Sequence, residues 1–265
     1  MQRPIITLTT DFGLEDHYAG TMKGVLLSSC ADAQLVDISH DVRKFNLYAG
    51  AYAIDQAAPY FPAGSVHLVV IDPGVGTERK PVLLHANKQF FVAPDNGVLS
   101  LIRARDPGAT AREISNKDLW LPSVSHTFHG RDIFAPVAAA VAAGSAQPED
   151  VGSILEDPVM LPGLEPHEIE RNHWQGMVLS VDHFGNVITN FRAGKFRAAL
   201  STKFFLEAGS GRVTEARQTF GQAEPGLCFA YAGSSGYLEI GLNQGDAARE
   251  LMIEPGVWVE LRIAD

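Results

Sequence analysis

The sequence contains few cysteines and no long apolar run, and these two absences narrow the class of protein. Its 265 residues include only two cysteines, Cys30 and Cys228. They lie far apart and without the spacing of metal ligands, so we expect two buried thiols rather than a disulfide framework or a zinc site. The N-terminal MQRPIITLTT lacks the apolar core of a signal peptide, and the stretch IFAPVAAAVAAG is too short to span a bilayer. A soluble cytoplasmic protein without a membrane partner is the expectation.

Basic residues and phosphate-binding motifs are also scarce. The chain has 21 basic and 31 acidic side chains, which gives a formal net charge of -10. The resulting field repels phosphate backbones and anionic lipids and favours cationic small molecules, so nucleic acid is not an expected partner. Neither G-x-G-x-x-G nor a Walker A motif occurs, and cradling of a pyrophosphate by backbone amides therefore has no support.

The first part of the chain alternates between strand-like and helix-like segments. PIITLTT, AQLVDIS and VHLVVID have the short apolar character of buried strands, and helix-like segments such as DHYAGTMKGVLLSSC, LYAGAYAIDQAAPYF and DIFAPVAAAVAAG separate or follow them. This alternation predicts a largely parallel β-sheet flanked by helices. The following segment, EDPVMLPGLEPHEIERNHW, is rich in proline and charge and predicts a linker.

Beyond the linker the pattern changes to short alternating strands with turns. GMVLSVDHFGNVITNF, CFAYAGSSGYLEIGL and GVWVELRIAD are typical of a small antiparallel sandwich or barrel. The sequence therefore predicts an α/β domain over residues 1–165 and a smaller antiparallel β domain over residues 172–265.

Two carboxylates follow predicted strands of the first domain. Asp72 ends the strand in VVIDPGVGTERK, and Asp11 ends the strand in TTDFGLEDHYAG. Ligands collect at the carboxyl ends of strands in open α/β sheets, and a carboxylate such as Asp11 can accept both hydroxyls of a ribose. The alternatives are structural: Asp-Pro-Gly is ordinary turn chemistry, and Asp11 or Asp16 could cap the following helix.

A histidine-containing motif, HTFHGRDIFAP, precedes the last predicted helix of this domain. His126, His129 and Asp132 could form a metal site if they lay on one helical face. Gly130 follows His129 directly, however, and the preceding residues resemble a loop, so a hydrogen-bonding histidine beside a site is the favoured interpretation. A satisfied core histidine is the alternative, and no metal is expected.

The second domain offers weaker signals in two turns. Asp182 and Asn186 flank the turn in VDHFGNVITN, which as a simple hairpin connection would need no function. As site residues, an aspartate suits an ammonium group and an asparagine suits an adenine edge, which together indicate an amino acid joined to a purine. AGSSGYLEIGLNQGDA adds hydroxyls and backbone amides for a carboxylate.

Six motifs occur in this order: TTDFGLEDHYAGTMKGVL, IDPGVGTER, APDNGVLS, TFHGRDIFAP, DHFGNVITN and SSGYLEIGLNQGDA. Together they resemble the S-adenosyl-L-methionine hydroxide adenosyltransferases, hydrolases related to the fluorinase and chlorinase enzymes. The resemblance runs along nearly the whole chain. It implies an N-terminal α/β domain, a C-terminal β-barrel domain, and a homotrimer whose active sites lie between the N-terminal domain of one subunit and the C-terminal domain of its neighbour.

The resemblance also implies roles for particular residues. Asp72, Arg79 and His129 would hold a nucleophilic water without a metal or other cofactor. The halogenases have uncharged residues at the first two of these positions and a serine at the position of Gly130, so the sequence favours water over a halide. Binding of the substrate would fall to Asp11 and Asp16 at the ribose, Tyr18 and Phe45 along the nucleoside pocket, Asn186 at the adenine, and Asp182 with Ser234 at the methionine end.

The expected activity is hydrolysis of S-adenosyl-L-methionine to adenosine and L-methionine. Three alternatives stay open: a chloride-using halogenase, a module that senses S-adenosyl-L-methionine or adenosine with negligible turnover, and a metal hydrolase built on the histidines. Ser235 stands where the fluorinase has an arginine, so the resemblance leaves open how the methionine carboxylate is held.

Overall fold

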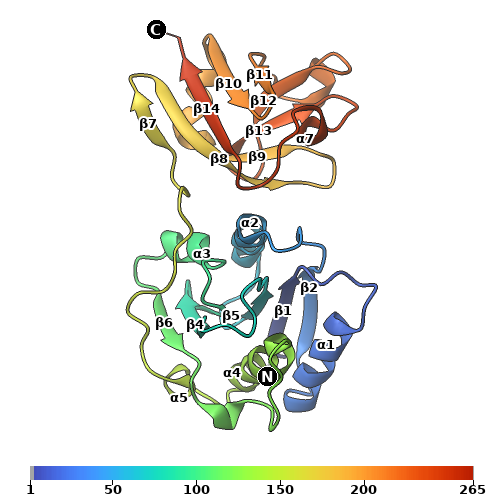
Figure 1. The fold of residues 1–265 in the computed structure, drawn as a ribbon, viewed down its shortest axis with the longest axis vertical. Helices are drawn as coiled ribbons and strands as arrows, with labels where there is room; N and C mark the ends of the chain where they lie inside the picture. The colour runs from blue at the N-terminus through green and yellow to red at the C-terminus, as the bar shows by residue number, and fades with distance from the viewer. Residues whose placement is uncertain (1–2, 265) are drawn as a thin grey trace. The chain divides into compact units, whose positions relative to one another are not determined.

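The computed structural model describes residues 3–264 as two compact units that divide between Leu161 and Pro162 (Figure 1). The N-terminal unit is built on a six-stranded, mostly parallel sheet and the C-terminal unit on an eight-stranded antiparallel sheet. The predicted fold class is therefore confirmed. The predicted linker is wrong in part, because strand β7 and the start of strand β8 lie within it.

Strands and helices alternate in the N-terminal unit. Its strands are β1 (Ile5–Thr10), β2 (Gln34–Ser39), β3 (Val66–Val70), β4 (Pro81–Ala86), β5 (Gln89–Pro94) and β6 (Thr110–Glu113). Its helices are α1 (Tyr18–Ser29), α2 (Leu47–Ala57), α3 (Ser100–Arg105), α4 (Ala135–Ala143) and α5 (Pro148–Val151), with short helical turns η1 (Ala58–Tyr60), η2 (Lys117–Leu119) and the π-helical η3 (Gly130–Phe134).

The sheet order β2-β1-β3-β5-β4-β6 creates a switch point at β1. The chain passes from β1 to β2 on one side and then returns to place β3 on the other side, and all three strands are parallel. In such sheets the loops that leave the two central strands diverge, which opens a crevice at their carboxyl ends. Strand β4 is antiparallel to both of its neighbours, β5 and β6.

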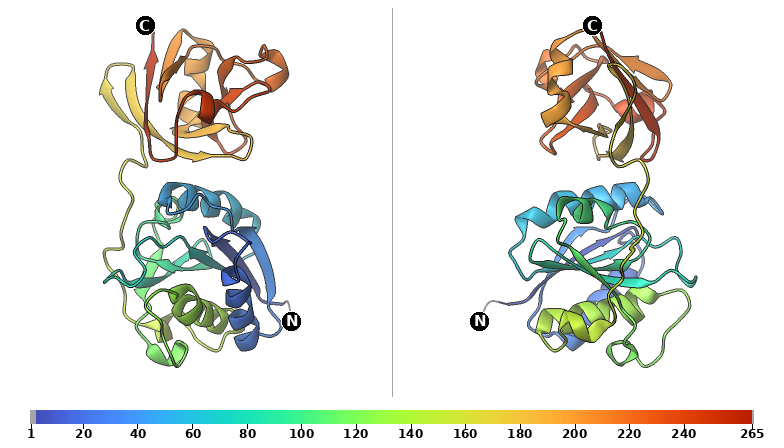
Figure 2. Two further views of the ribbon diagram at one scale, coloured as in Figure 1. Left: turned by 45° about the vertical axis from the view of Figure 1, so that its right-hand side comes forward. Right: turned by 90° about the vertical axis from the view of Figure 1, so that its left-hand side faces the viewer.

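Helices cover both faces of this sheet (Figure 2). Helices α1 and α4 pack on one face with Leu68 and Val70 of β3, whereas α2 and α3 pack on the other face, where Val69 belongs to the core. Side chains of a strand alternate between the two faces. Strand β3 is buried along its whole length, as its VHLVV sequence predicted.

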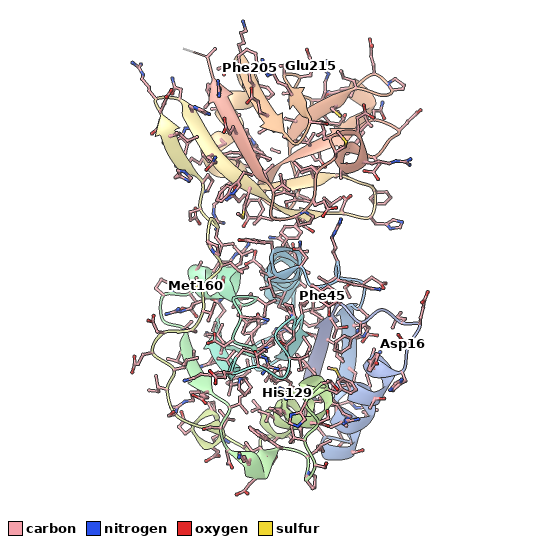
Figure 3. The ribbon with its side chains drawn as sticks, in the orientation of Figure 1. Asp16, Phe45, His129, Met160, Phe205 and Glu215 are labelled. Atoms are coloured by element: carbon pink, nitrogen blue, oxygen red, sulfur yellow. The ribbon has the colours of Figure 1, made fainter. Side chains whose placement is uncertain are left out.

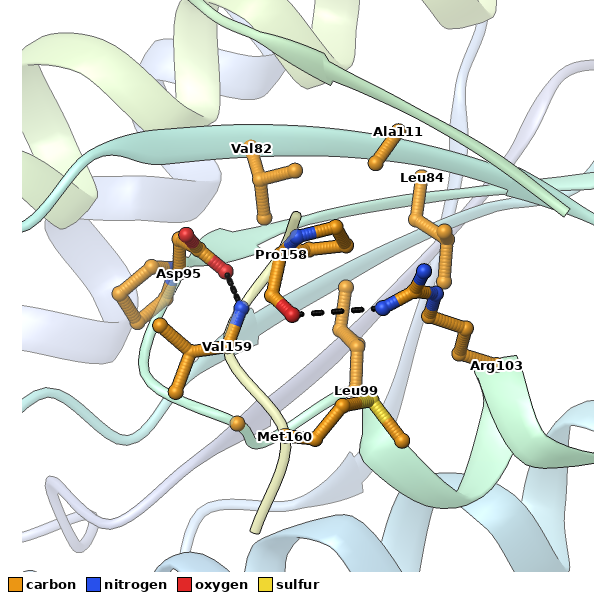
Figure 4. A pocket seen from close by; sticks show the side chains of 11 residues that line it. Val82, Leu84, Asp95, Leu99, Arg103, Ala111, Pro158, Val159 and Met160 are labelled. Carbon is orange, nitrogen blue, oxygen red and sulfur yellow. Dashed lines mark hydrogen bonds between the residues drawn. The ribbon is translucent and has the colours of Figure 1, made fainter. Parts of the chain in front are cut away.

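The segment Pro158–Met160 packs against the N-terminal unit beside β4. The Val159 amide donates to Asp95 Oδ1 at 2.9 Å, and Arg103 Nη1 donates to the Pro158 carbonyl at 3.3 Å (Figure 4). A small, largely apolar pocket lies between this segment and β4, with Val82 and Leu84 in its wall. Burial raises the pKa of Asp95, and the hydrogen bond from the Val159 amide is the main interaction that acts to lower it.

The C-terminal unit is a nearly closed antiparallel sheet. Its strands are β7 (His167–Glu170), β8 (His173–Val181), β9 (Val187–Arg192), β10 (Phe204–Ala208), β11 (Gly211–Val213), β12 (Cys228–Ala232), β13 (Tyr237–Leu242) and β14 (Trp258–Ile263). Short helical segments α6 (Ala193–Phe196), η4 (Arg197–Ser201), η5 (Phe220–Gln222) and α7 (Ala247–Glu250) connect them.

The strand order β11-β10-β14-β8-β9-β13-β12, with β7 added beside β8, brings the two ends of the sheet together. A bridge between Ala216, just after β11, and Ala230 of β12 joins these ends. The interior is filled by apolar side chains such as Phe191, Leu206 and Leu238. This arrangement covers most of the unpaired strand edges that an open sheet would present.

The prediction of two buried thiols is confirmed in part. Cys30 is buried and Cys228 is half-buried, so only the first is the buried thiol that we expected. Burial raises the pKa of both thiols, which keeps them protonated at neutral pH. Within residues 3–264, none of the helices has the length and apolar character needed to cross a bilayer.

Two glycines of the N-terminal unit predict opposite responses to alanine. Gly144 ends α4 with a positive φ of 71°, whereas Gly24 lies inside α1 with open space where a Cβ would be. We expect Gly144→Ala to lower the free energy of unfolding by about 1 kcal/mol because an L side chain is strained there. Gly24→Ala should raise it by about 0.5–1 kcal/mol. Urea unfolding of the two variants would test this. Changes of the same sign in the free energy of unfolding would contradict the assigned helix geometry.

Candidate active site

Two carboxylates meet at the switch point of the parallel sheet. Asp11 follows β1 and Asp72 follows β3, and the last residues of these strands, Thr10 and Val70, are paired neighbours. Burial raises the pKa of Asp11, and the negative charge of Asp72 raises it further, so the two side chains interact electrostatically. The carboxyl ends of the two central strands therefore carry two acidic groups.

Asp11 does not cap a helix, so that alternative is wrong. Helix α1 begins at Tyr18, and the residue before it, His17, makes no side-chain cap. Asp11 Oδ2 instead accepts the backbone N–H of Phe45 at 2.8 Å. Phe45 has a positive φ of 64° and a side chain that is mostly exposed. The loop before α2 is thus tied to the loop after β1 through Asp11.

Asp72 and Arg79 form a buried ion pair across the PGVG turn. Arg79 Nε lies 3.0 and 3.1 Å from the two carboxylate oxygens, and Nη2 bonds Oδ2 as well. The side chains are only 5% and 9% exposed. Gly76 has a φ of 80°, and a Cβ there would lie 2.5 Å from the carbonyl oxygen of His126. The glycine is required because the backbone passes so close to the His126 loop.

His129 joins this pair from the segment before α4. Its Nδ1 lies 2.9 Å from Arg79 Nη2. A guanidinium can only donate, so Nδ1 accepts and the neutral ring carries its proton on Nε2. Burial lowers the pKa of His129, and the positive charge of Arg79 lowers it further. Among residues 3–264, no hydrogen bond engages Arg79 Nη1, so its two N–H groups are available to a ligand.

The segment that carries His129 is held by Asp132 and Ser125. Asp132 is fully buried and accepts the Ser125 N–H and hydroxyl, each at 2.8 Å, as well as Arg131 Nε at 2.6 Å. Burial alone would raise the pKa of Asp132, but the hydrogen bonds from Arg131 and from the Ser125 amide and hydroxyl outweigh this effect and lower the pKa. The sequence analysis considered Asp132 only as a metal ligand. No group of three His, Cys, Asp or Glu side chains in the described part of the chain is arranged to hold a metal ion.

Three aromatic side chains pack together near the start of α1. Tyr18 packs edge-on against Phe128 at 5.2 Å between ring centroids, and Phe12 lies within 6.0 Å of both. A pocket of about 400 Å³ opens next to these rings. Figure 3 labels Asp16, Phe45 and His129, which come from three separate segments of the unit. Asp16 is exposed in the loop before α1, and within residues 3–264 no hydrogen bond or ion pair joins it to Asp11 or Asp72.

The turn between β8 and β9 contains Asp182 and Asn186, as predicted for a hairpin. Asp182 Oδ1 accepts the backbone N–H groups of Phe184 and Asn186, each at 2.9 Å, and Oδ2 accepts Asn186 Nδ2 at 2.8 Å. Gly185 supplies the positive φ of 83° that the turn needs. These bonds fix the two side chains against each other, and they leave the amide oxygen of Asn186 unused.

Ser234 is exposed in the turn between β12 and β13, and a buried glutamate supports this turn. Ser235 donates to Glu239 Oε1 at 2.5 Å, and Glu239 is only 7% exposed. Gly233 packs so closely on the same carboxylate that a Cβ would overlap with it. The sequence analysis missed Glu239; the signal for it is a lone charge in the apolar strand YLEIGL.

Comparisons with known proteins match both units to one family. Residues 6–152 match the SAM hydroxide adenosyltransferase N-terminal domain, and residues 176–260 match the C-terminal domain of that family. An (R)-S-adenosyl-L-methionine hydrolase of Thermus thermophilus is 39% identical over 98% of this chain and 99% of its own length. A fluorinase of Nocardia brasiliensis is 29% identical over 99% and 98% of the two chains. The crystal structure of an uncharacterized conserved protein from Thermotoga maritima superposes with a TM-score of 0.86 at 36% identity, covering 97% and 99%.

The geometry around His129 predicts a low pKa that depends on Arg79. We expect the His129 ring to titrate below the ordinary value of 6.5, and Arg79→Met to raise that pKa because a neighbouring positive charge is removed. NMR titration of the imidazole signals, assigned with His129→Gln, would measure both values. Arg103→Met removes an arginine elsewhere in the unit and should leave the titration unchanged. A fall of the pKa in Arg79→Met would contradict the contact.

Proposed function

The chain belongs to the SAM hydroxide adenosyltransferase family, and on this premise we propose that it hydrolyses S-adenosyl-L-methionine to adenosine and L-methionine. The oxygen of a water or hydroxide attacks C5′ of the ribose in line with the sulfonium. The C5′–S bond breaks, its electron pair stays on sulfur, and methionine leaves as a neutral thioether. One proton of the water is released. No acid is needed for the leaving group.

The fixed position of Arg79 is the observation that carries this proposal. Asp72 occupies Nε and part of Nη2, and His129 occupies the rest of Nη2, which leaves Nη1 for a nucleophile. Bulk water has a pKa of about 15.7, so its activation is the chemical difficulty. A guanidinium beside the water favours the hydroxide form through its positive charge. Because the pair is buried, solvent screens the charge of the guanidinium less than it would at the surface.

Asp72 acts as an orienting anion and His129 as an orienting group. A carboxylate that binds Nε and Nη2 together holds the guanidinium plane in one direction. In the ground state Nδ1 of His129 is engaged by Arg79 and Nε2 carries a proton. His129 therefore lacks a free lone pair for use as a general base, and we assign it a donor role in the hydrogen-bond network around the nucleophile. Charge is neutralised as hydroxide meets sulfonium, so a site with little water favours the step.

We propose that the remaining predicted residues bind the substrate. Asp11 would accept the ribose hydroxyls, with Tyr18 and Phe45 along the nucleoside and Asp16 nearby. Asn186 would meet the adenine edge, and Asp182 with Ser234 would hold the methionine end. The nucleophile residues belong to the N-terminal unit and the methionine residues to the C-terminal unit. This division supports the proposed homotrimer, in which two neighbouring subunits contribute to each site. The cytoplasmic location stays a prediction.

Isotope labelling tests the reaction. The purified protein is incubated with S-adenosyl-L-methionine in oxygen-18 water, with and without chloride and a chelator, and the products are read by mass spectrometry. We expect labelled adenosine and L-methionine at a rate that neither additive changes. Chlorinated adenosine would assign the protein to the halogenases. Loss of activity with chelator would favour a metal hydrolase, and affinity for the substrate without any product would favour a sensor.

Single substitutions should separate the nucleophile residues from the binding residues. Asp72→Asn or Arg79→Met should lower kcat roughly a hundredfold or more, because each removes stabilisation of the attacking oxygen, and should change KM little. Asp11→Asn should instead raise KM roughly tenfold through weaker ribose binding. Steady-state kinetics would measure both constants.

Asp95→Asn is the matched control for these variants. Asp95 also follows a strand of the same sheet, and burial also raises its pKa, but its partner is the backbone of Val159. It should leave kcat and KM near the values of the unmodified protein. Equal increases of KM in the Asp11, Asp72 and Arg79 variants would refute the division of roles.

A further inference from the structure

We propose that the buried residues Thr10 and His40, with Asp37 beside the His40 ring, form a polar relay that positions Asp11 for the ribose. The inference rests on the proposed function, because it assigns a purpose to the loop that carries Asp11. None of the three residues is among those that the resemblance assigns to the site. They are positioning residues and do not contact the substrate themselves.

The relay runs from the surface to the end of β1. Thr10 Oγ1 lies 2.8 Å from His40 Nδ1, and His40 Nε2 lies 3.1 Å from Asp37 Oδ1. Thr10 is fully buried and His40 is 3% exposed. The second oxygen of Asp37 accepts Lys23 Nζ at 2.6 Å near the surface. Within residues 3–264 this buried nitrogen has no hydrogen-bond partner, and its contact with Asp37 is electrostatic.

The contacts of His40 favour one direction of hydrogen bonding. The carboxylate of Asp37 can only accept, so its contact with Nε2 favours the tautomer of His40 that carries the ring proton on Nε2. Nδ1 is then an acceptor, so the Thr10 hydroxyl donates to it. The oxygen of that hydroxyl keeps its lone pairs and accepts the Phe12 N–H at 3.4 Å. The backbone just beyond Asp11 is therefore bonded to the same hydroxyl that His40 orients.

Two backbone bonds join the same elements around Asp11. The Gly13 N–H donates to the carbonyl of His40 at 2.7 Å, and the Val42 N–H donates to the carbonyl of Thr10 at 3.3 Å. Asp11 itself receives the Phe45 N–H. The loop after β1 and the loop after β2 are thus bonded on both sides of Asp11, and the His40 ring contacts Thr10 directly before it. Loss of the ring contact should broaden the range of orientations that the Asp11 carboxylate takes.

The order threonine, histidine and aspartate resembles a nucleophilic triad, but the burial argues against that role. A nucleophilic hydroxyl has to reach the substrate, and the Thr10 side chain has no exposed surface. Its hydroxyl hydrogen is directed at His40, and its oxygen faces the Phe12 amide. The relay therefore shapes the site and supplies no covalent chemistry.

The same strand provides a matched control. Thr7, three residues earlier in β1, is also fully buried, and its Oγ1 lies 2.8 Å from Nδ1 of another buried histidine, His67. His67 belongs to β3, stacks on Phe91, and has a pKa lowered to about 4 by burial. The Thr7 pair lies away from the carboxyl end of the strand. Both pairs serve the packing of the unit, and only the Thr10 pair adjoins Asp11.

The test compares Thr10→Val with Thr7→Val. Valine has nearly the same shape as threonine, so each substitution removes one buried hydroxyl and little else. Each also leaves one imidazole nitrogen without its donor, so both variants should have a urea midpoint that is lowered to a similar extent. Thr10→Val should raise KM roughly fivefold to tenfold with little change in kcat, and should weaken adenosine binding by a similar factor in calorimetry. Thr7→Val should change neither constant.

Variants of His40 supply the rescue. His40→Leu removes both ring nitrogens, whereas the amide oxygen of His40→Asn can accept the Thr10 hydroxyl in place of Nδ1. We expect His40→Leu to raise KM and His40→Asn to have a KM close to that of the unmodified protein. Equal KM values in Thr10→Val, Thr7→Val and the unmodified protein would overturn the inference, as would a leucine variant that folds and binds adenosine normally.

The adenosine affinity separates this inference from the proposed function. If the unmodified protein binds adenosine but makes none, the proposed reaction fails, and weaker binding in Thr10→Val alone would still support the relay. If the protein makes adenosine and Thr10→Val behaves as Thr7→Val does, the reaction stands and the relay is refuted. A protein that neither makes nor binds adenosine would contradict both.

Discussion

The buried ion pair between Asp72 and Arg79 is the interaction on which the arrangement of the site depends. Breaking a buried pair by removing one partner leaves an uncompensated charge, which costs far more than the pair contributes when it is intact. The pair therefore fixes the guanidinium in one orientation, and His129 follows because its Nδ1 accepts from the same group. Glycines in the PGVG turn allow the chain to return from Asp72 to Arg79 beside the His126 loop.

The sheet topology explains why the acidic groups of the N-terminal unit meet. The chain changes its direction across the sheet at β1, so the loops after β1 and β3 leave the same edge and diverge. Asp11 and Asp72 are the first carboxylates beyond these two strands. Burial of Asp11 and, to a smaller extent, the negative charge of Asp72 oppose ionisation of Asp11, and the backbone N–H of Phe45 acts against this. A cationic substrate would favour both charges, which agrees with the acidic balance of the whole chain.

Sequence reasoning succeeded for strand ends and turns and failed for two buried carboxylates, Glu239 and Asp132, whose burial local patterns do not show. The strand ends at Asp11 and Asp72 and the hairpin around Asp182 and Asn186 follow from alternating apolar residues and turn glycines. Glu239 was missed because a charge in an apolar strand has no local explanation; its partner is Ser235 in the preceding turn. Asp132 was considered only as a ligand, although its role is to hold the segment before α4.

The sequence by itself determined the class of the two units, the positions of their turns and the residue types available for chemistry, because hydrophobic periodicity and glycine conformations act over a few residues. It also carried the ordered set of motifs that relates the chain to its family. Only the tertiary structure decided which of these side chains bond one another. Arg79 binds both Asp72 and His129, 50 residues further along, and His40 meets Thr10 from the loop after β2. Such contacts depend on strand order and burial, which local patterns do not encode.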